Sequence, residues 1–489
     1  MFRKAFSERY SLARHRGAVF AACAVLALPA ASSAGSVLWD PPAIDVFPNH
    51  ERVLRGKQSL KEFLADGRQL FMTRFNVLDG AGRPTGTGDS KPTIRRPPTK
   101  LFQRIAGPDA NSCAGCHNQP FIGGTGDFVA NVFVGAHFTD PPTESVAATI
   151  TNERNTIGMF GSGAIEMLAQ EMTADLHDLR AQARVKASTA KEDARADLQT
   201  KGVNFGYLVA HPDGTIDTKG VRGVDADLVV KPFGTKGVAV SLREFTIFAL
   251  NQHHGIQVVE RFGWPRTGTT DFDGDGVADE FSVGQVSALS AFQATLPAPS
   301  RVKPTTVADV EAVTLGEIRF GEIGCGSCHI PRLPLRSLWF FEPNPYNRPG
   351  AVVPTDVGGQ IAIPLPFSDD SALFKDATGA PFVAAYTDLK RHVICDDDEP
   401  FFCNETLRQD FVPTNQFLTS KLWDAGTSAP YGHRGDLTTL SEAIIHHSGE
   451  AKEVKQAFLT LPDNEKTAVI KFLRSLQVTK DFNGSTEWR

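Results

Sequence analysis

Residues 320–335 read FGEIGCGSCHIPRLPL, and residues 107–124 read GPDANSCAGCHNQPFIGG. Each stretch contains a Cys-x-x-Cys-His run. This run is typical of covalent c-type haem attachment, in which two thiols add to the haem vinyl groups and the histidine becomes an axial iron ligand. The two runs predict two haem c sites, formed by Cys113, Cys116 and His117 and by Cys325, Cys328 and His329. The alternatives are one all-thiolate zinc site or thiol redox chemistry, and neither requires a histidine after both pairs.

A helical segment precedes each run. Residues 59–75 (SLKEFLADGRQLFMTRF) and the segment that starts at residue 307 carry apolar side chains at helical spacing. A third helix is predicted after Pro462, where acidic residues come first and basic residues last. This repeated order predicts a mainly α fold, with two cytochrome c-like haem domains, long loops and a small β excursion.

The predicted domain boundaries follow from that repeat. Residues 35–300 form the first haem domain, with an insert at about 171–240, and residues 301–489 form the second. Within the first, residues 161–202 are predicted as one helix that begins apolar and becomes charged. Residues 203–240 are predicted as a small hairpin region, because they alternate and contain turn dipeptides. Residues 241–264 are predicted as a buried helix.

The N-terminus resembles an export signal. Residues 1–34 combine basic residues, a short apolar run and a small-residue cleavage site near Ala34. We therefore expect a periplasmic or secreted protein with no integral membrane segment after cleavage. A retained N-terminal anchor is the alternative, although the apolar run is short for spanning a bilayer.

The net charge favours some partners over others. Cleavage removes five basic residues and one acidic residue, which takes the formal net charge from −6 to −10. An acidic protein is poorly suited to nucleic acid and better suited to a small basic redox protein as electron donor or acceptor. Two cysteines remain outside the signal and the haem motifs, Cys395 and Cys403, and in an exported protein they predict a disulfide.

The opposite axial ligand decides what each haem does, because a six-coordinate iron carries electrons and an open position binds peroxide or dioxygen. No methionine follows Met172. The second haem is therefore expected to use a histidine, which lowers the reduction potential. Its candidates are His392, His433, His446 and His447, and those for the first haem are His137, His253, His254, Met159 and Met167. His253 and His254 are adjacent on a helix, so at most one should face a given iron.

Two acidic features are further candidates. Glu166 lies in an apolar context (GSGAIEML), which predicts either a structural pairing or a catalytic acid–base group with a raised pKa. Asp271, Asp273 and Asp275 begin like a calcium-binding loop. The match is partial, since Ser282 replaces the bidentate glutamate, and a solvated acidic turn is the alternative.

Several blocks resemble the bacterial di-haem cytochrome c peroxidase and MauG-like superfamily, and more specifically its di-haem oxidoreductase family. They are SCAGCHNQPFIGGTGD, GSGAIEMLAQE, HHGIQVVERFGW, GCGSCHIPRL and KLWDAGTSAPYGHRGDLTTLSEAIIHHSGEA. The resemblance covers about residues 59–480 and matches least around 171–240. It implies two cytochrome c-like domains, two covalent haems and calcium between them, with Ser428, Ala429 and Pro430 as a further candidate calcium segment.

The resemblance also implies a ligand for the second haem. In the peroxidases it lies 14 residues after the histidine of the Ala-Pro-Tyr-x-His motif, and that position, counted from His433, is His447. The peroxidases have methionine there and MauG-type proteins have tyrosine, so a bis-histidine second haem is expected here.

These observations lead to one main hypothesis and two alternatives. The main hypothesis is a peroxidase-like di-haem oxidoreductase. Its first haem binds the oxidant, peroxide or dioxygen, with Glu166 as acid–base group, and its second haem supplies electrons. The alternatives are a non-enzymatic di-haem electron-transfer cytochrome and a haem-dependent oxygenase related to rubber oxygenases.

Overall fold

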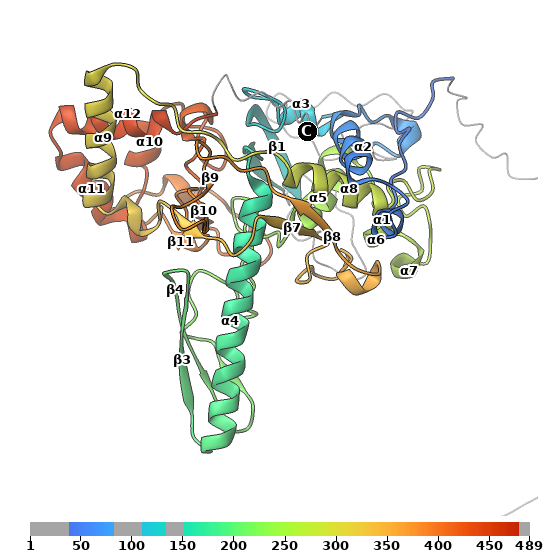
Figure 1. Ribbon diagram of the computed structural model, residues 1–489, viewed down its shortest axis with the longest axis horizontal. Helices are drawn as coiled ribbons and strands as arrows, with labels where there is room; N and C mark the ends of the chain where they lie inside the picture. The colour runs from blue at the N-terminus through green and yellow to red at the C-terminus, as the bar shows by residue number, and fades with distance from the viewer. Residues whose placement is uncertain (1–38, 83–109, 134–150, 479–489) are drawn as a thin grey trace, which may run out of the picture. The chain divides into compact units, whose positions relative to one another are not determined.

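The computed structural model describes residues 39–82, 110–133 and 151–478 (Figure 1). The predicted signal at residues 1–34 and the candidate ligand His137 lie outside the described residues. By their contacts, Pro41–Arg489 form one compact unit, and the division at residue 300 stays a prediction. Among the described helices, none is both long and apolar enough to cross a membrane.

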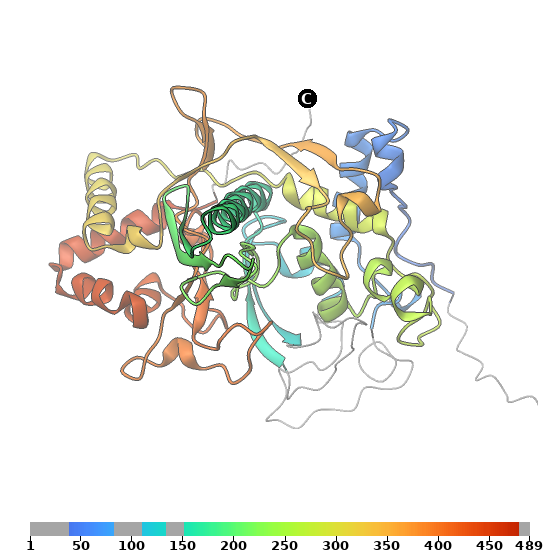
Figure 2. The same ribbon diagram turned by 90° about the horizontal axis from the view of Figure 1, so that it is seen from below.

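Helices gather around each Cys-x-x-Cys-His run. Before residue 300 they are α1 (His50–Leu54), α2 (Leu60–Met72), α3 (Cys113–Cys116), α4 (Ser162–Ala190), α5 (Leu242–Ala249), α6 (Val259–Phe262), α7 (Trp264–Thr267) and α8 (Val283–Ala294). After it they are α9 (Val307–Glu322), α10 (Leu440–Ile445), α11 (Lys452–Thr460) and α12 (Asp463–Ser475). In both views α9–α12 form one group and α2, α5 and α8 another (Figures 1 and 2).

Small antiparallel sheets fill much of the rest, so the described fold is a mixture of helices and short sheets and is only partly the mainly α fold that we expected. The pairs are β1 (Gly126–Phe133) with β2 (Thr151–Thr156), β7 (Trp339–Glu342) with β8 (Ile361–Pro364), and β11 (Arg391–Val393) with β12 (Gln416–Leu418). The three-stranded sheets are β3 (Ala194–Thr200), β4 (Val203–Ala210) and β5 (Ile216–Asp217), and β6 (Leu333–Pro334), β10 (Pro381–Val383) and β9 (Leu373–Lys375).

The insert differs from its prediction at one boundary. Helix α4 ends at Ala190, and Lys191 adopts a left-handed conformation with φ 59°. Residues 194–200 then alternate between buried and exposed positions as strand β3, rather than continuing the helix to residue 202. The β3–β4 hairpin runs beside α4 (Figure 1), so the predicted small β excursion is present.

The segment predicted as one helix at 241–264 is divided into three pieces. Helix α5 continues into a π-helical turn at Leu250–His254, and Gly255 then ends it with φ 73°. Helix α6 begins only at Val259. Apolar periodicity marks which face is buried but does not detect the wider π turn, which adds one residue to a turn.

Helices α2 and α8 cross in close contact. A Cβ on Gly67 would lie 2.0 Å from the carbonyl oxygen of Ala288 and 2.9 Å from the Cβ of Phe292. One turn after Gly67, Phe71 packs on Phe292 with ring centroids 5.4 Å apart, and its ring lies 6.5 Å from that of His117.

The same crossing recurs between α9 and α12. A Cβ on Gly316 would lie 2.0 Å from the carbonyl oxygen of Ala468 and 2.9 Å from the Cβ of Phe472. Phe320 lies 5.3 Å from Phe472 and 6.3 Å from His329. Each Cys-x-x-Cys-His run is thus placed by an equivalent helix crossing, an internal repeat that composition and periodicity alone do not specify.

This close crossing makes a testable prediction. Gly316→Ala should lower the free energy of unfolding by about 1–3 kcal/mol, because the new methyl group overpacks the crossing. Gly321→Ala in the same helix has no atom within 4 Å of its Cβ, and it should be neutral or stabilising by up to about 1 kcal/mol. Chemical denaturation of both variants measures the difference, and equal free energies of unfolding would contradict the close contact between α9 and α12.

Candidate haem sites

The first Cys-x-x-Cys-His run is held as a short helix. The Ser112 hydroxyl caps α3 by accepting a hydrogen bond from the Gly115 N–H at 3.0 Å. His117 follows directly, with its Nδ1 3.1 Å from the carbonyl oxygen of Ile157 and 3.3 Å from that of Gly124. Burial lowers the pKa of His117 to about 4. A proton on Nδ1, donated to these carbonyls, leaves the Nε2 lone pair available to a metal.

The second run repeats this arrangement. His329 Nδ1 lies 3.0 Å from the carbonyl oxygen of Tyr386, and burial lowers the pKa of His329 to about 4. Both histidines are therefore neutral near pH 7 and are oriented by main-chain carbonyls. That orientation is typical of an imidazole that binds a metal through Nε2.

A cavity lies beside each run. The first cavity, of about 130 Å³, is lined by Cys113, Cys116 and His117. The second cavity, of about 320 Å³, is lined by Cys325, Cys328 and His329. Each set of three predicted attachment residues therefore meets at one hollow, and the residues present fit a covalently held haem.

The two cavities share a wall. Five residues line both of them, and we call them the shared wall: Asn155, Thr156, Ile157, Gly234 and Thr235. Ile157 in this wall also accepts the hydrogen bond from His117. The sequence alone gave no sign of the wall, because residues 151–158 have no motif and residues 233–239 lie in the insert.

His447 lines the second cavity together with His329. Its Nδ1 lies 2.6 Å from the carbonyl oxygen of Ala443, one turn earlier. Burial lowers the pKa of His447. His447 thus shows the same pattern as His117 and His329, with Nδ1 on a carbonyl and Nε2 as the remaining nitrogen.

The other histidines near the second cavity make different contacts. Both nitrogens of His392 lie 2.8 Å from carboxylates, those of Asp388 and Glu450. Burial lowers its pKa, but the contacts with Asp388 and with Cys328 outweigh burial and raise the pKa of His392 to about 10. A protonated imidazole has no lone pair for iron.

His446 and His433 are also engaged. His446 stacks on Phe401 with centroids 4.0 Å apart and bonds to Glu399. His433 Nε2 lies 2.8 Å from Asn404 Oδ1, and burial, together with the nearby Arg154, lowers the pKa of His433 to about 3. Among the candidates, His447 has the arrangement closest to that of an iron ligand.

Around the first cavity, the π-helical turn brings both of its histidines to the lining. His253, His254 and Met159 line this cavity, whereas Met167 is not among its lining residues. His254 Nδ1 lies 2.6 Å from the carbonyl oxygen of Ala110, and its Nε2 is 3.9 Å from Cys113 Sγ. His254 is therefore directed at the attachment cysteine, while His253 remains a candidate ligand.

Glu166 lines neither cavity. It is fully buried and accepts hydrogen bonds from the first backbone N–H of α5, at Leu242, at 2.7 Å, and from Asn344 Nδ2 at 2.9 Å. Burial is the main cause that raises the pKa of Glu166 to about 8. The apolar sequence context predicted such a raised pKa for a catalytic acid–base group. The structure does not bring Glu166 together with His117, and its catalytic role stays a prediction.

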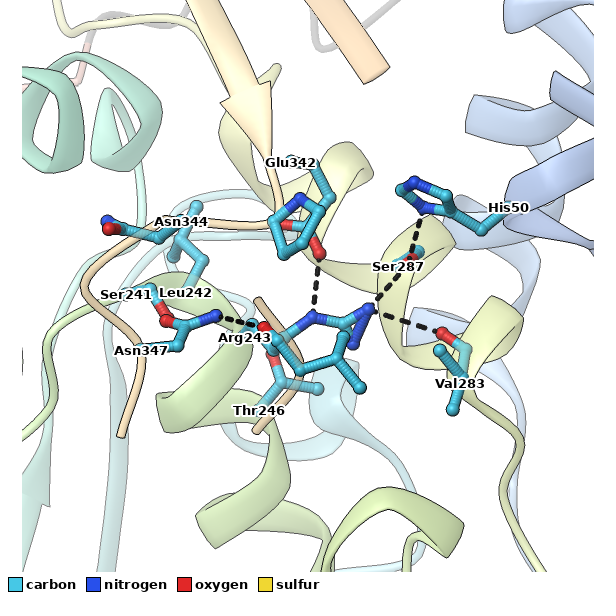
Figure 3. A network of polar contacts seen from close by, with 12 residues as sticks. His50, Ser241, Leu242, Arg243, Thr246, Val283, Ser287, Glu342, Asn344 and Asn347 are labelled. Carbon is cyan, nitrogen blue, oxygen red and sulfur yellow. Dashed lines mark hydrogen bonds and ion pairs between the residues drawn. The ribbon is translucent and has the colours of Figure 1, made fainter. Parts of the chain in front are cut away.

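A buried polar network surrounds Arg243 (Figure 3). The fully buried Arg243 donates to Glu342 at 2.9 Å, to Glu260 at 2.7 Å and to Ser287 at 2.5 Å. Burial raises the pKa of Glu342 from 4.5 to about 7, although Arg243 opposes this. The network joins α5 and α8 to β7. An arginine inside an apolar helical stretch was its one sequence signal.

The acidic loop and the disulfide are both formed. Ligand oxygens of Asp271, Asp273 and Asp275 lie within 4.8 Å of one another. Asp271 already accepts hydrogen bonds from the N–H groups of Gly274, Asp275 and Gly276, so calcium binding stays a prediction. The predicted Cys395–Cys403 disulfide is confirmed, with Cα atoms 5.7 Å apart.

Comparison with known proteins supports the resemblance seen in the sequence. Residues 377–476 match the model of a family described as "Di-haem oxidoreductase, putative peroxidase". Over these residues the chain is similar to the di-haem oxidoreductase family. The matched range includes His447 and the contacts that orient it, and a di-haem family implies haem as cofactor.

Other comparisons add less. No curated protein matches the chain. Among solved structures, a hydrazine synthase of Kuenenia stuttgartiensis aligns with 90% of this chain and 96% of its own, at 13% identity and a TM-score of 0.37. A MauG-like protein associated with microbial copper homeostasis aligns with 93% of this chain and 100% of its own, at 15% identity and a TM-score of 0.36.

Proposed function

We propose that this chain is a member of the di-haem oxidoreductase family, holds two covalent haems c and acts as a peroxidase-like enzyme. Cys113, Cys116 and His117 hold the first haem, and Cys325, Cys328 and His329 hold the second, with His447 as its sixth ligand. The observation that carries the proposal is the pair of cavities, each lined by one Cys-x-x-Cys-His run, that share a wall.

When bound, the haem irons supply the redox chemistry, with the oxidant at the first and electrons from the second. The protein orients the ligands of both irons. His117, His329 and His447 each hold a proton on Nδ1 against a carbonyl oxygen, which fixes the ring and keeps Nε2 directed at the metal. The shared wall places the two cavities side by side, which would shorten the path of electrons between the haems.

The partners and location follow from the same proposal. Peroxide is the first oxidant to test and dioxygen the second, and the electron donor is a small redox protein that meets an acidic surface. We also propose export to the periplasm or the exterior, where the Cys395–Cys403 disulfide is stable. Calcium at Asp271, Asp273 and Asp275 is a further proposal, supported by the proximity of their oxygens.

A second candidate function rests on His253. This residue lines the first cavity together with His117. If it ligates the first iron on the open side, both irons are six-coordinate and the protein is an electron-transfer cytochrome without turnover.

Peroxide turnover separates the two functions. The holoprotein should consume hydrogen peroxide at the expense of a reduced electron-donor dye, and cyanide should inhibit it by occupying the first iron. No turnover in the wild type, combined with turnover that appears in His253→Ala, would overturn the peroxidase proposal in favour of the cytochrome.

A further inference from the structure

Residues 395–403 (CDDDEPFFC), which the Cys395–Cys403 disulfide closes, lie against the second cavity; we call them the clamp loop. Cys395 packs in an apolar cluster with Phe402, Phe417 and Leu437. Phe402 and Phe417 also line the second cavity. The disulfide therefore lies directly behind the wall of that cavity.

The clamp loop, together with Ile394 just before it, holds the chain just after His447. The Ser448 N–H donates to the carbonyl oxygen of Ile394 at 2.9 Å. The Ser448 hydroxyl donates to Asp396 Oδ2 at 2.8 Å, and the Gly449 N–H donates to the same oxygen at 3.2 Å. Ser448 is fully buried, whereas the Asp396 side chain is 30% exposed, so these bonds are partly shielded from competing water.

The clamp loop also contacts the residues before and at His447. Phe401 stacks on His446 with an interplanar angle of 20°, and Glu399 bonds to His446 Nδ1 at 3.1 Å. Phe402 meets the ring of His447 edge-on, with centroids 5.8 Å apart. Every residue from 446 to 449 is thus touched by the segment from Val393 to Phe402.

Helix α10 contributes one contact to the direction of His447, the bond from its Nδ1 to the carbonyl oxygen of Ala443. The helix ends at Ile445, and His447 lies beyond its C-cap residue, His446. Residues after a helix end lack the regular hydrogen bonds that set side-chain direction. Gly449 has φ 56°, and a Cβ there would lie 2.5 Å from the carbonyl oxygen of Val393 and 3.1 Å from that of Cys395, so the clamp loop and the residues before it approach closely.

We propose that the clamp loop is a positioning element for the axial ligand of the second haem. It fixes the backbone of residues 446–449 and thereby presents His447 Nε2 to the second cavity. This inference rests on the proposed function, because it takes His447 as the sixth ligand. Without the clamp loop, the segment would have to be ordered each time His447 binds the iron, which weakens the bond between them.

The test compares two acids of the same loop in the ferric holoprotein. Asp396→Ala removes the acceptor of Ser448 and Gly449, whereas Asp398→Ala removes an exposed carboxylate that pairs with Lys452. A double variant, Cys395→Ser with Cys403→Ser, opens the loop by a different route. His447→Ala defines the second-haem signal as the low-spin paramagnetic resonance signal that disappears.

Cyanide competes with His447 for the second iron, so the measured quantity is the cyanide concentration that removes half of the second-haem signal. It should fall by about tenfold or more in Asp396→Ala, because two charge-assisted hydrogen bonds are lost and about 1.4 kcal/mol corresponds to a factor of ten. It should fall likewise in the cysteine double variant and stay unchanged in Asp398→Ala. If this cyanide concentration has the wild-type value in both Asp396→Ala and the double variant, the clamp loop does not position His447, although His447 can still be the ligand. If no low-spin signal disappears in His447→Ala, the ligand assignment is overturned instead.

Discussion

His447→Ala should remove the low-spin ferric signal of the second haem and leave a high-spin signal in its place. His447 lines the second cavity together with His329, and its Nδ1 is held by the carbonyl oxygen of Ala443. Loss of the only side chain proposed for the sixth position opens the iron to water and to small ligands. Paramagnetic resonance and the visible spectrum of the purified ferric variant measure the change.

The adjacent residue provides the control. His446→Ala removes a ring that stacks on Phe401 and bonds to Glu399. It should keep the second haem low-spin. If His446→Ala loses the low-spin signal of the second haem and His447→Ala keeps it, the ligand has been assigned to the wrong histidine.

Arg243→Ala should destabilise the protein by about 3–5 kcal/mol, the range for breaking a buried ion pair. Arg243 is fully buried and donates to two carboxylates, those of Glu342 and Glu260, and Figure 3 shows the first of these bonds. Its removal leaves both groups buried without their cation. Chemical denaturation at pH 7 measures the loss. Arg195→Ala, which breaks an exposed pair with Asp197, should cost about 0–1 kcal/mol.

The loss in Arg243→Ala should also depend on pH. Burial already raises the pKa of Glu342 from 4.5 to about 7, with Arg243 opposing the rise, so removal of Arg243 raises that pKa further. Below about pH 7 the native carboxyl is protonated in both proteins, and above it only the native variant keeps the proton while the unfolded chain has released it, so the loss relative to wild type should grow as pH rises from about 7 to 8. A difference between variant and wild type that is constant over this range would contradict the role assigned to Arg243.

Local features of the fold could be predicted from the sequence. The apolar spacing at 59–75 predicted a helix, and α2 buries Phe63, Leu64, Leu70 and Phe71 as expected. Polar termini and Pro462 predicted α12, and the two leftover cysteines predicted their disulfide. Each of these depends on neighbouring residues or on a short loop, and such interactions are visible in the sequence.

Features that depend on distant segments could not be predicted. Glu166 has the raised pKa expected of an acid in apolar surroundings. Its partners are Leu242 and Asn344, which lie 76 and 178 residues away, and they place it outside both cavities. The shared wall likewise joins residues 155–157 with residues 234–235. Spacing within one segment contains no information about which remote segment will pack against it.

The central claim is that the two haem sites are unequal, with an open first iron and a second iron closed by His447. Quantitative paramagnetic resonance of the fully ferric wild-type holoprotein tests it most directly. We expect one high-spin signal, which shifts on addition of cyanide, and one low-spin signal of equal intensity. Two low-spin signals that together account for all of the iron would contradict the account.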